Sequence, residues 1–186
     1  AINAPLADDI YDVLNPIVEW TDTETLGSAF NSLYTQHNDH RTLATRLAYL
    51  GTLKVTGKID FRTLTFLAHI ALPLLLIALY RMSGSAQNRI VILLPAALLL
   101  LNLRAYGLTF WSMAAFAYFY SFLYGFYSLY FLHNVSPPRF LLAALLATLA
   151  SFTLASGHMV WVIGLALLAH QCLVRRNAHW AYIVLW

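Results

Sequence analysis

Long apolar runs separated by short polar segments make up most of this chain. They occupy residues 61–80, 90–103, 108–132 and 140–174, and the last run is long enough for two helices divided near Ser156-Gly157-His158. A membrane-spanning helix needs about 20 mostly apolar residues. The pattern therefore predicts an all-α fold in which residues 61–186 form a bundle of about five transmembrane helices. Pro95 predicts a tilt or kink in the second of these helices.

The first 60 residues are more polar, and their apolar positions recur at helical spacing. One predicted face carries Ile10, Val13, Leu14 and Ile17, and a second carries Leu43, Leu47 and Leu50. Asn38 or Asp39 would cap this second helix, Gly51 would end it, and Asp60 would cap the first span. We expect residues 1–60 to form a water-facing segment of amphipathic helices lying on the membrane surface.

The distribution of charged residues predicts the orientation of the bundle in the membrane. The chain is 60% hydrophobic and 10% charged, and all 8 acidic residues lie at or before Asp60. If residues 1–60 lie outside the cytoplasm, the inward loops hold Arg81, Arg89, Arg139, Arg175 and Arg176, and the outward loops hold only Arg104. The positive-inside rule then places residues 1–60 on the periplasmic or extracellular side of the membrane. Basic residues distributed in this way do not indicate a nucleic-acid partner.

The lack of carboxylates after Asp60 restricts the chemistry within this chain. Any acidic base, nucleophile or metal ligand must come from residues 1–60. Transporters and proton pumps usually carry ionisable groups within their spans, so a small transporter is the least favoured function. The chain has 1 cysteine, Cys172, and therefore no internal disulfide.

Asp8, Asp9 and Asp12 form the first candidate site. On a helix, Asp12 shares a face with each of the other two, and close carboxylates raise one another's pKa, which suits a general base. Asp8 and Asp12 would also suit a divalent cation such as Mg²⁺ or Mn²⁺. The alternative is a solvated acidic first turn that the helix dipole stabilises.

The second candidate site is the run Gln36-His37-Asn38-Asp39-His40-Arg41. The chemistry of His37, Asn38, His40 and Arg41 favours recognition of an anionic substrate group. Zinc binding by the two histidines lacks an obvious third protein ligand. A role in capping and surface polarity remains open.

The third predicted span is rich in aromatic residues. One face carries Tyr120, Tyr124 and Tyr127, and a strip of small residues is formed by Ala117, Ser121 and Gly125. This pattern predicts close helix packing with tyrosine hydroxyls bonded to neighbouring helices. The alternative is a groove for an isoprenoid tail or pigment. His69, His158 and His170 could ligate haem or chlorophyll, but packed or interfacial histidine is the favoured interpretation.

The order of motifs resembles a largely uncharacterised group of bacterial polytopic membrane proteins. The resemblance lies in Asp8-Asp9-Ile10-Tyr11-Asp12, then residues 36–41, then a Leu-rich helix and Thr56-Gly57-Lys58-Ile59-Asp60-Phe61. Their layout is similar to that of the C-type membrane glycosyltransferases. That similarity implies transfer of a sugar from a polyprenyl-phosphate donor on the periplasmic side. Asp9 or Asp8 would be the general base, and the leaving phosphate would be received by Arg41 and its histidine neighbours.

A non-catalytic role is the competing hypothesis. In it, the chain is a structural or assembly subunit of a larger membrane complex, and its partners are membrane proteins in place of a lipid-linked donor. The chain lacks an initiator Met and closes at Trp186 within a new apolar run, so we expect it to be part of a longer or processed protein.

Overall fold

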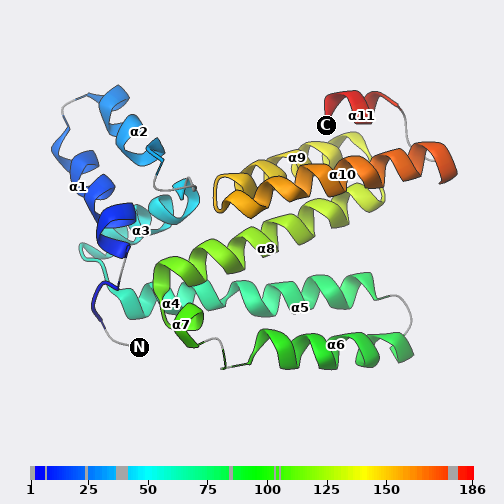
Figure 1. Ribbon diagram of the computed structural model, residues 1–186, viewed down its shortest axis with the longest axis horizontal. Coiled ribbons are helices and arrows are strands. Elements are labelled where there is room, and N and C mark those ends of the chain that lie inside the picture. The colour runs from blue at the N-terminus through cyan, green and yellow to red at the C-terminus, as the bar shows by residue number, and fades with distance from the viewer. Residues whose placement is uncertain are drawn as a thin grey trace.

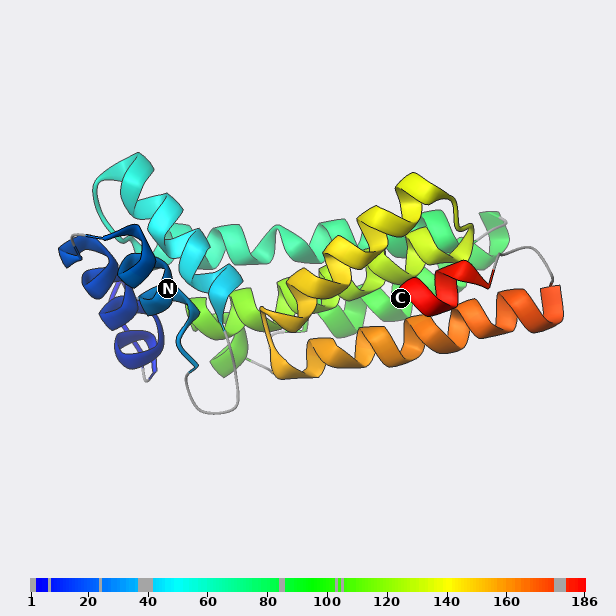
Figure 2. The same ribbon diagram turned by 90° about the horizontal axis from the view of Figure 1, so that it is seen from above.

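The computed structural model describes residues 3–6, 8–23, 25–36, 42–83, 86–102, 104, 106–175 and 180–186. These residues form helices and connecting turns and contain no strand, which confirms the predicted all-α fold. The long helices run side by side along the longest axis of the molecule, and the N-terminal helices pack against one end of them (Figure 1). The view from above shows the same arrangement (Figure 2).

The N-terminal segment contains one π-helix and three α-helices. They are η1 (Asp9–Leu14), α1 (Asn15–Asp22), α2 (Leu26–Tyr34) and α3 (Leu43–Thr56). Val13 and Ile17 are buried as predicted, whereas Ile10 is exposed and Asp9 takes the inward position. Residues four apart share a helix face, so Asp9 lies on the same side as Val13, and Ile17 continues that side in α1.

Helix α3 differs from its prediction in both its end and its buried face. It continues through Gly51 and ends at Gly57, whose φ of 73° is the left-handed conformation that glycine adopts without strain. Leu47 is exposed, and the buried face carries Thr45, Arg46, Tyr49 and Leu50. The apolar spacing was therefore a misleading guide here, because a polar stripe turns inward to meet the carboxylates of η1.

The remaining chain forms the bundle. Its elements are α4 (Phe61–His69), α5 (Ala71–Met82), α6 (Ala86–Leu100), α7 (Tyr106–Thr109), α8 (Ser112–His133), α9 (Pro137–Ser151), η3 (Ala155–His158), α10 (Met159–His170), η4 (Gln171–Arg175) and α11 (Ala181–Leu185). Asp60 caps α4 as predicted, since its Oδ1 accepts from the Arg62 amide at 2.9 Å and the Thr63 amide at 3.3 Å. The joint between α4 and α5 lies at Ile70. Pro73 has no amide hydrogen, so it cannot donate a helical hydrogen bond to the carbonyl of His69.

Helix α8 is the central element and packs against both halves of the bundle. Its small residues Ala117, Ser121 and Gly125 are buried as the packing strip predicted. Ser128 extends that strip and donates to the Ala143 carbonyl of α9 at 2.8 Å. On another face, the Tyr120 hydroxyl donates to the Leu67 carbonyl at 3.0 Å and the Tyr127 hydroxyl to the Leu74 carbonyl at 3.4 Å. Tyr120 and Tyr127 thus join α8 to α4 and α5 through their hydroxyls, as predicted.

Helices α9 and α10 are divided at the place that the sequence indicated. Their turn contains Gly157, where a Cβ would overlap the Ala150 carbonyl and lie 2.7 Å from the Ser151 amide nitrogen. Because both obstacles are backbone atoms, only glycine fits. The chain then reverses into α10 beside α8.

Two helical stretches in the described part of the chain are long and apolar enough to cross a membrane. They are Phe61–Met82, which combines α4 and α5, and Ala155–Val174. Arg89–Leu100 and Pro137–Ser151 are apolar but shorter. Helix α8 has 22 residues, but its tyrosines and serines lower its mean hydropathy. Two of the predicted spans are therefore long and apolar enough in the described part of the chain, and the full set of about five spans stays a prediction.

Charged residues are separated along the length of the bundle. The acidic N-terminal helices cover one end (Figure 1). The α5–α6 connection, the α8–α9 connection and the end of η4 lie at the opposite end (Figure 1). Arg81, Arg89, Arg139 and Arg175 belong to the helical turns beside these connections.

Candidate functional site

A buried ion pair lies at the centre of the N-terminal segment. Arg46 Nη2 lies 2.7 Å from Asp12 Oδ1, and the two side chains are only 1% and 2% exposed. The remaining guanidinium donors reach the Asp12 carbonyl and the carbonyls of Leu33 and Thr35 at the end of α2. Thr42 donates its hydroxyl to the Asp12 carboxylate at 2.8 Å. Arg46 therefore ties η1, α2 and α3 together through one side chain.

Asp9 joins the N-terminal segment to the bundle. Its Oδ2 accepts from the Leu6 amide at 2.8 Å, and its Oδ1 accepts from the Tyr49 hydroxyl at 3.2 Å. Tyr49 also shares a hydrogen bond of 2.5 Å with the hydroxyl of Ser112, the first residue of α8. The Asp9 side chain thus lies at the N-terminal end of α8, where the helix dipole favours a negative charge.

Burial decides the electrostatics of this carboxyl. Desolvation raises the pKa of Asp9 above its ordinary value of 3.8, and contacts with the Leu6 amide, the Tyr49 hydroxyl, the Trp111 indole and the Met113 amide partly oppose that rise. Desolvation and the nearby charge of Asp9 also raise the pKa of Tyr49, so its hydroxyl stays protonated and remains a donor. At 1% exposure Asp9 is reached by solvent only if the segment moves.

Two further contacts hold the N-terminal segment on the bundle. The Ala44 amide in the first turn of α3 donates to the Phe152 carbonyl at 3.4 Å, just after α9. The Phe61 amide at the start of α4 donates to Asn3 Oδ1 at 2.9 Å. One end of the bundle is therefore the meeting point of the start of the chain with α3, α4, α8 and α9.

The three predicted acidic residues occupy different environments. Asp9 and Asp12 are buried and hydrogen-bonded within the protein, whereas Asp8, at the N-terminal boundary of η1, is partly exposed and makes no capping hydrogen bond. Among the described residues no group of three or more histidine, cysteine and carboxylate side chains lies close enough to hold a metal ion. A divalent cation at Asp8 and Asp12 remains a prediction. The predicted substrate-binding residues His37, Asn38, His40 and Arg41, and the predicted caps Asn38 and Asp39, lie outside the described residues.

Sequence reasoning missed the partners of the carboxylates. Arg46, Tyr49 and Ser112 complete the network, and none of them belongs to the motifs identified from the sequence. A signal was present in the polar stripe Thr42, Thr45, Arg46 and Tyr49, which recurs every three to four residues along α3. That stripe shows which face of α3 meets polar groups, but not that its partners are Asp9, Asp12 and a serine far along the chain.

Two of the three histidines that were considered as cofactor ligands contact a backbone carbonyl three or four residues before them. His69 Nδ1 lies 2.6 Å from the Thr65 carbonyl, and its ring contacts Phe119 edge to face. His158 Nδ1 lies 2.9 Å from the Ala155 carbonyl. His69 therefore agrees with the packed interpretation, whereas His158 is exposed beside the turn between α9 and α10.

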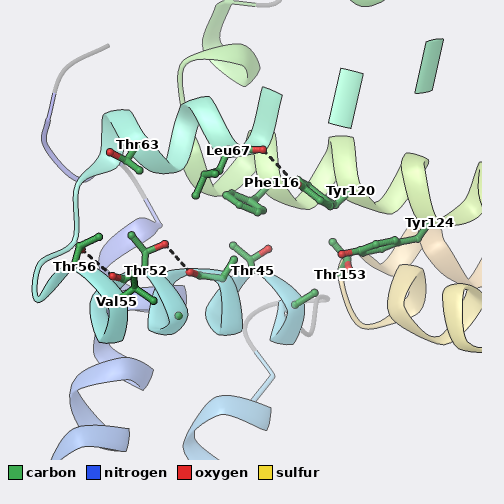
Figure 3. A pocket seen from close by; sticks show the side chains of 13 residues that line it. Thr45, Thr52, Val55, Thr56, Thr63, Leu67, Phe116, Tyr120, Tyr124 and Thr153 are labelled. Atoms are coloured by element: carbon green, nitrogen blue, oxygen red, sulfur yellow. Dashed lines mark hydrogen bonds between the residues drawn. The ribbon is translucent and has the colours of Figure 1, made fainter. Parts of the chain in front are cut away.

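A groove of about 500 Å³ lies between α3 on one side and α4 and α8 on the other. Thr45 and Thr52 of α3 line it opposite Leu67, Phe116 and Tyr120 (Figure 3). Tyr124 and Thr153 close its inner end (Figure 3). We call this space the α3–α8 groove; it is separate from the buried network, because neither Asp9 nor Tyr49 lines it.

No protein-family model matches the chain, and neither a curated protein nor a solved structure shows significant similarity to it.

Proposed function

We propose that the chain is embedded in a membrane through about five helices and carries its acidic segment on the outer face. The support is the apolar exterior of the bundle. Ile90, Val91 and Leu99 of α6 are 71%, 71% and 76% exposed, and α9 and α10 carry similar exposed side chains such as Leu141 and Val162. An apolar exterior of this extent is typical of contact with lipid.

The distribution of charge supports this orientation. Arg81, Arg89 and Arg139 lie near helix ends at one pole of the bundle, and the described carboxylates lie at the other pole, together with Arg46 and Arg62. Within the two long apolar stretches, only 39% and 33% of the most apolar part is buried, so most of each faces outward. A core helix of a water-soluble domain would be mostly buried.

The function that we propose is transfer of a sugar from a polyprenyl-phosphate donor. The observation that carries this proposal is the position of Asp8. Its carboxylate is partly exposed and lies at the start of η1. The hydrogen bonds of Asp9 and Asp12 hold η1 in place at the N-terminal end of α8. A general base must be held firmly and must also be reached by its substrate. Of the two predicted bases, Asp8 is the one that a substrate can reach, and it lies on a backbone that the contacts of Asp9 and Asp12 hold in place, so Asp9 is a positioning residue.

The proposed reaction is a displacement at the anomeric carbon. Asp8 removes the proton from an acceptor hydroxyl, the hydroxyl oxygen forms a bond to the anomeric carbon, and the bond from that carbon to the phosphate oxygen breaks. The polyprenyl phosphate leaves with the electron pair. The negative charge of the leaving phosphate is proposed to be stabilised by hydrogen bonds from Arg41, His37, Asn38 and His40.

The test is a transfer assay with the full-length gene product in membranes of a strain that lacks the chromosomal copy. The donors are radiolabelled monosaccharides linked to polyprenyl phosphate, supplied as a panel. We expect Asp8→Asn to abolish transfer and Glu19→Gln, a change of an exposed carboxylate on α1, to preserve it. Full activity of Asp8→Asn contradicts the role of Asp8, and no transfer by wild type from any donor contradicts the function.

A second function has one observation in its favour. Asp9 and Asp12 are both occupied by contacts within the protein, as in a segment whose role is to hold a shape. A structural or assembly subunit would need that shape for docking to another membrane protein. Purification of the full-length protein in mild detergent as part of a stable multi-protein particle, without transfer activity, would favour this function.

A further inference from the structure

We propose that the α3–α8 groove holds one hydrocarbon chain of a membrane lipid. The inference rests on the proposed membrane location and is independent of the sugar-transfer reaction. It assigns a ligand to a surface that is separate from the carboxylate network.

The chemistry of the lining favours hydrocarbon. None of the described residues that line the groove is charged, and its walls are formed by methyl groups, methylenes and aromatic rings such as those of Ala48, Leu67 and Phe116. Apolar contact without charge is the environment that a lipid chain prefers to water.

Four of the seven hydroxyl groups that line the groove donate to carbonyls of the protein. Thr52 donates to the Ala48 carbonyl at 2.9 Å, Thr56 to the Thr52 carbonyl at 2.8 Å and Tyr120 to the Leu67 carbonyl at 3.0 Å (Figure 3). Thr153 donates to the Leu149 carbonyl at 2.6 Å. A sugar or peptide would lose its hydrogen bonds to water here and regain few of them, which is costly. A hydrocarbon chain loses none.

One polar atom remains unsatisfied beside the groove. Thr45 is 1% exposed, and its Oγ1 has no hydrogen-bond partner among the described residues. Its side chain projects between α3 and α8 (Figure 3). Because this oxygen is buried, it offers no accessible polar group with which a sugar or peptide could replace its hydrogen bonds to water.

The position of the groove also fits a lipid. Its outer end lies beside Thr56 and Thr63, close to the start of the apolar stretch Phe61–Met82. Its inner end reaches Tyr124, 12 residues into α8, a distance of about 18 Å along the helix. The groove therefore runs along the part of the bundle next to its outer face, from the start of Phe61–Met82 to the turn between α9 and α10.

A photolabelling experiment tests this occupant. The full-length protein is placed in phosphatidylcholine vesicles that contain a small fraction of phosphatidylcholine with a diazirine near the end of one acyl chain. After irradiation, mass spectrometry compares the labelling of groove peptides, from α3 and the first half of α8, with that of the outward face of α10. We expect wild type to be labelled at both.

Gly51→Trp and Leu47→Trp form a matched pair on α3. Gly51 lines the groove and has open space where its side chain would be, so a tryptophan there fills the groove without a clash. Leu47 is 49% exposed and does not line the groove. We expect Gly51→Trp to lose labelling of the groove peptides and keep that of α10, and Leu47→Trp to keep both.

Equal labelling of groove peptides in wild type and Gly51→Trp overturns the proposal, as does the absence of groove labelling in wild type. Melting temperatures of both variants close to that of wild type show that the fold is intact. Because sugar transfer is not measured, these outcomes do not depend on the proposed reaction.

Discussion

At the scale of single residues, burial separates carboxylates that the sequence presents as equivalent. Asp12 is paired with Arg46, Asp9 is held by neutral donors, and Asp8 keeps an exposed surface. The capping role of Asp60 could be predicted, because a cap depends on residues next to it in the chain. The partners of Asp9 and Asp12 could not, because they come from α3 and α8 and meet only through packing.

The ion pair leads to a prediction about stability. Arg46→Met leaves the Asp12 carboxylate buried without its counter-charge, so we expect the free energy of unfolding to fall by about 3–5 kcal/mol. Thermal unfolding of the purified protein in detergent measures this loss. Arg62→Met, a change of an exposed arginine in α4, is the control and should have little effect. An equal effect of the two substitutions would show that the ion pair contributes nothing specific.

Asp9 leads to a prediction about pH. A carboxyl whose pKa is raised by folding stabilises the fold when it is protonated, and that contribution is lost as the pH rises from its unfolded-state pKa of about 3.8 through its folded-state value. We expect the melting temperature of wild type, relative to Asp9→Asn, to fall over this range and then level off. Melting curves of both proteins between about pH 4 and pH 8 test the sign. A relative melting temperature that rises with pH would contradict the account.

At the scale of elements, the predictions succeeded where the signal was local and strong. The division near Gly157 and the small-residue face of α8 were both predicted from spacing along the chain. The end of α3 was placed at Gly51 instead of Gly57. Two glycines in one helical region offer two stops, and the structure shows that Gly57 is the one with the left-handed φ that caps the helix.

The glycines themselves provide a test at this scale. Gly157→Ala places a Cβ against the Ala150 carbonyl, so the turn between α9 and α10 must shift, and we expect a loss of about 1–3 kcal/mol. Gly51→Ala adds a methyl group in open space within α3 and should stabilise the protein by about 0.5–1 kcal/mol. Thermal unfolding of both variants measures the difference. Similar effects of the two changes would show that the turn is not as tightly packed as described.

At the scale of the whole molecule, hydropathy predicted the helical regions of the bundle, because long apolar runs depend little on detail. The sequence also predicted that acidic residues and loop arginines would lie on opposite sides, and the helix ends are arranged in this way. It could not show that the N-terminal helices would close over the end of α8, nor that a groove would remain beside them. Both features arise from how α3 packs.

The central claim is a chain that crosses the membrane about five times with the acidic segment outside, and labelling of Ser156 tests it most directly. In a Cys172→Ser background, single cysteines at Asp22, Met82, Asn134 and Ser156 are exposed to a membrane-impermeant maleimide in intact cells. Five crossings predict labelling at Asp22→Cys and Ser156→Cys and none at Met82→Cys and Asn134→Cys until the cells are opened. If only Phe61–Met82 and Ala155–Val174 cross, Ser156→Cys lies inside and stays unlabelled, which would contradict the account.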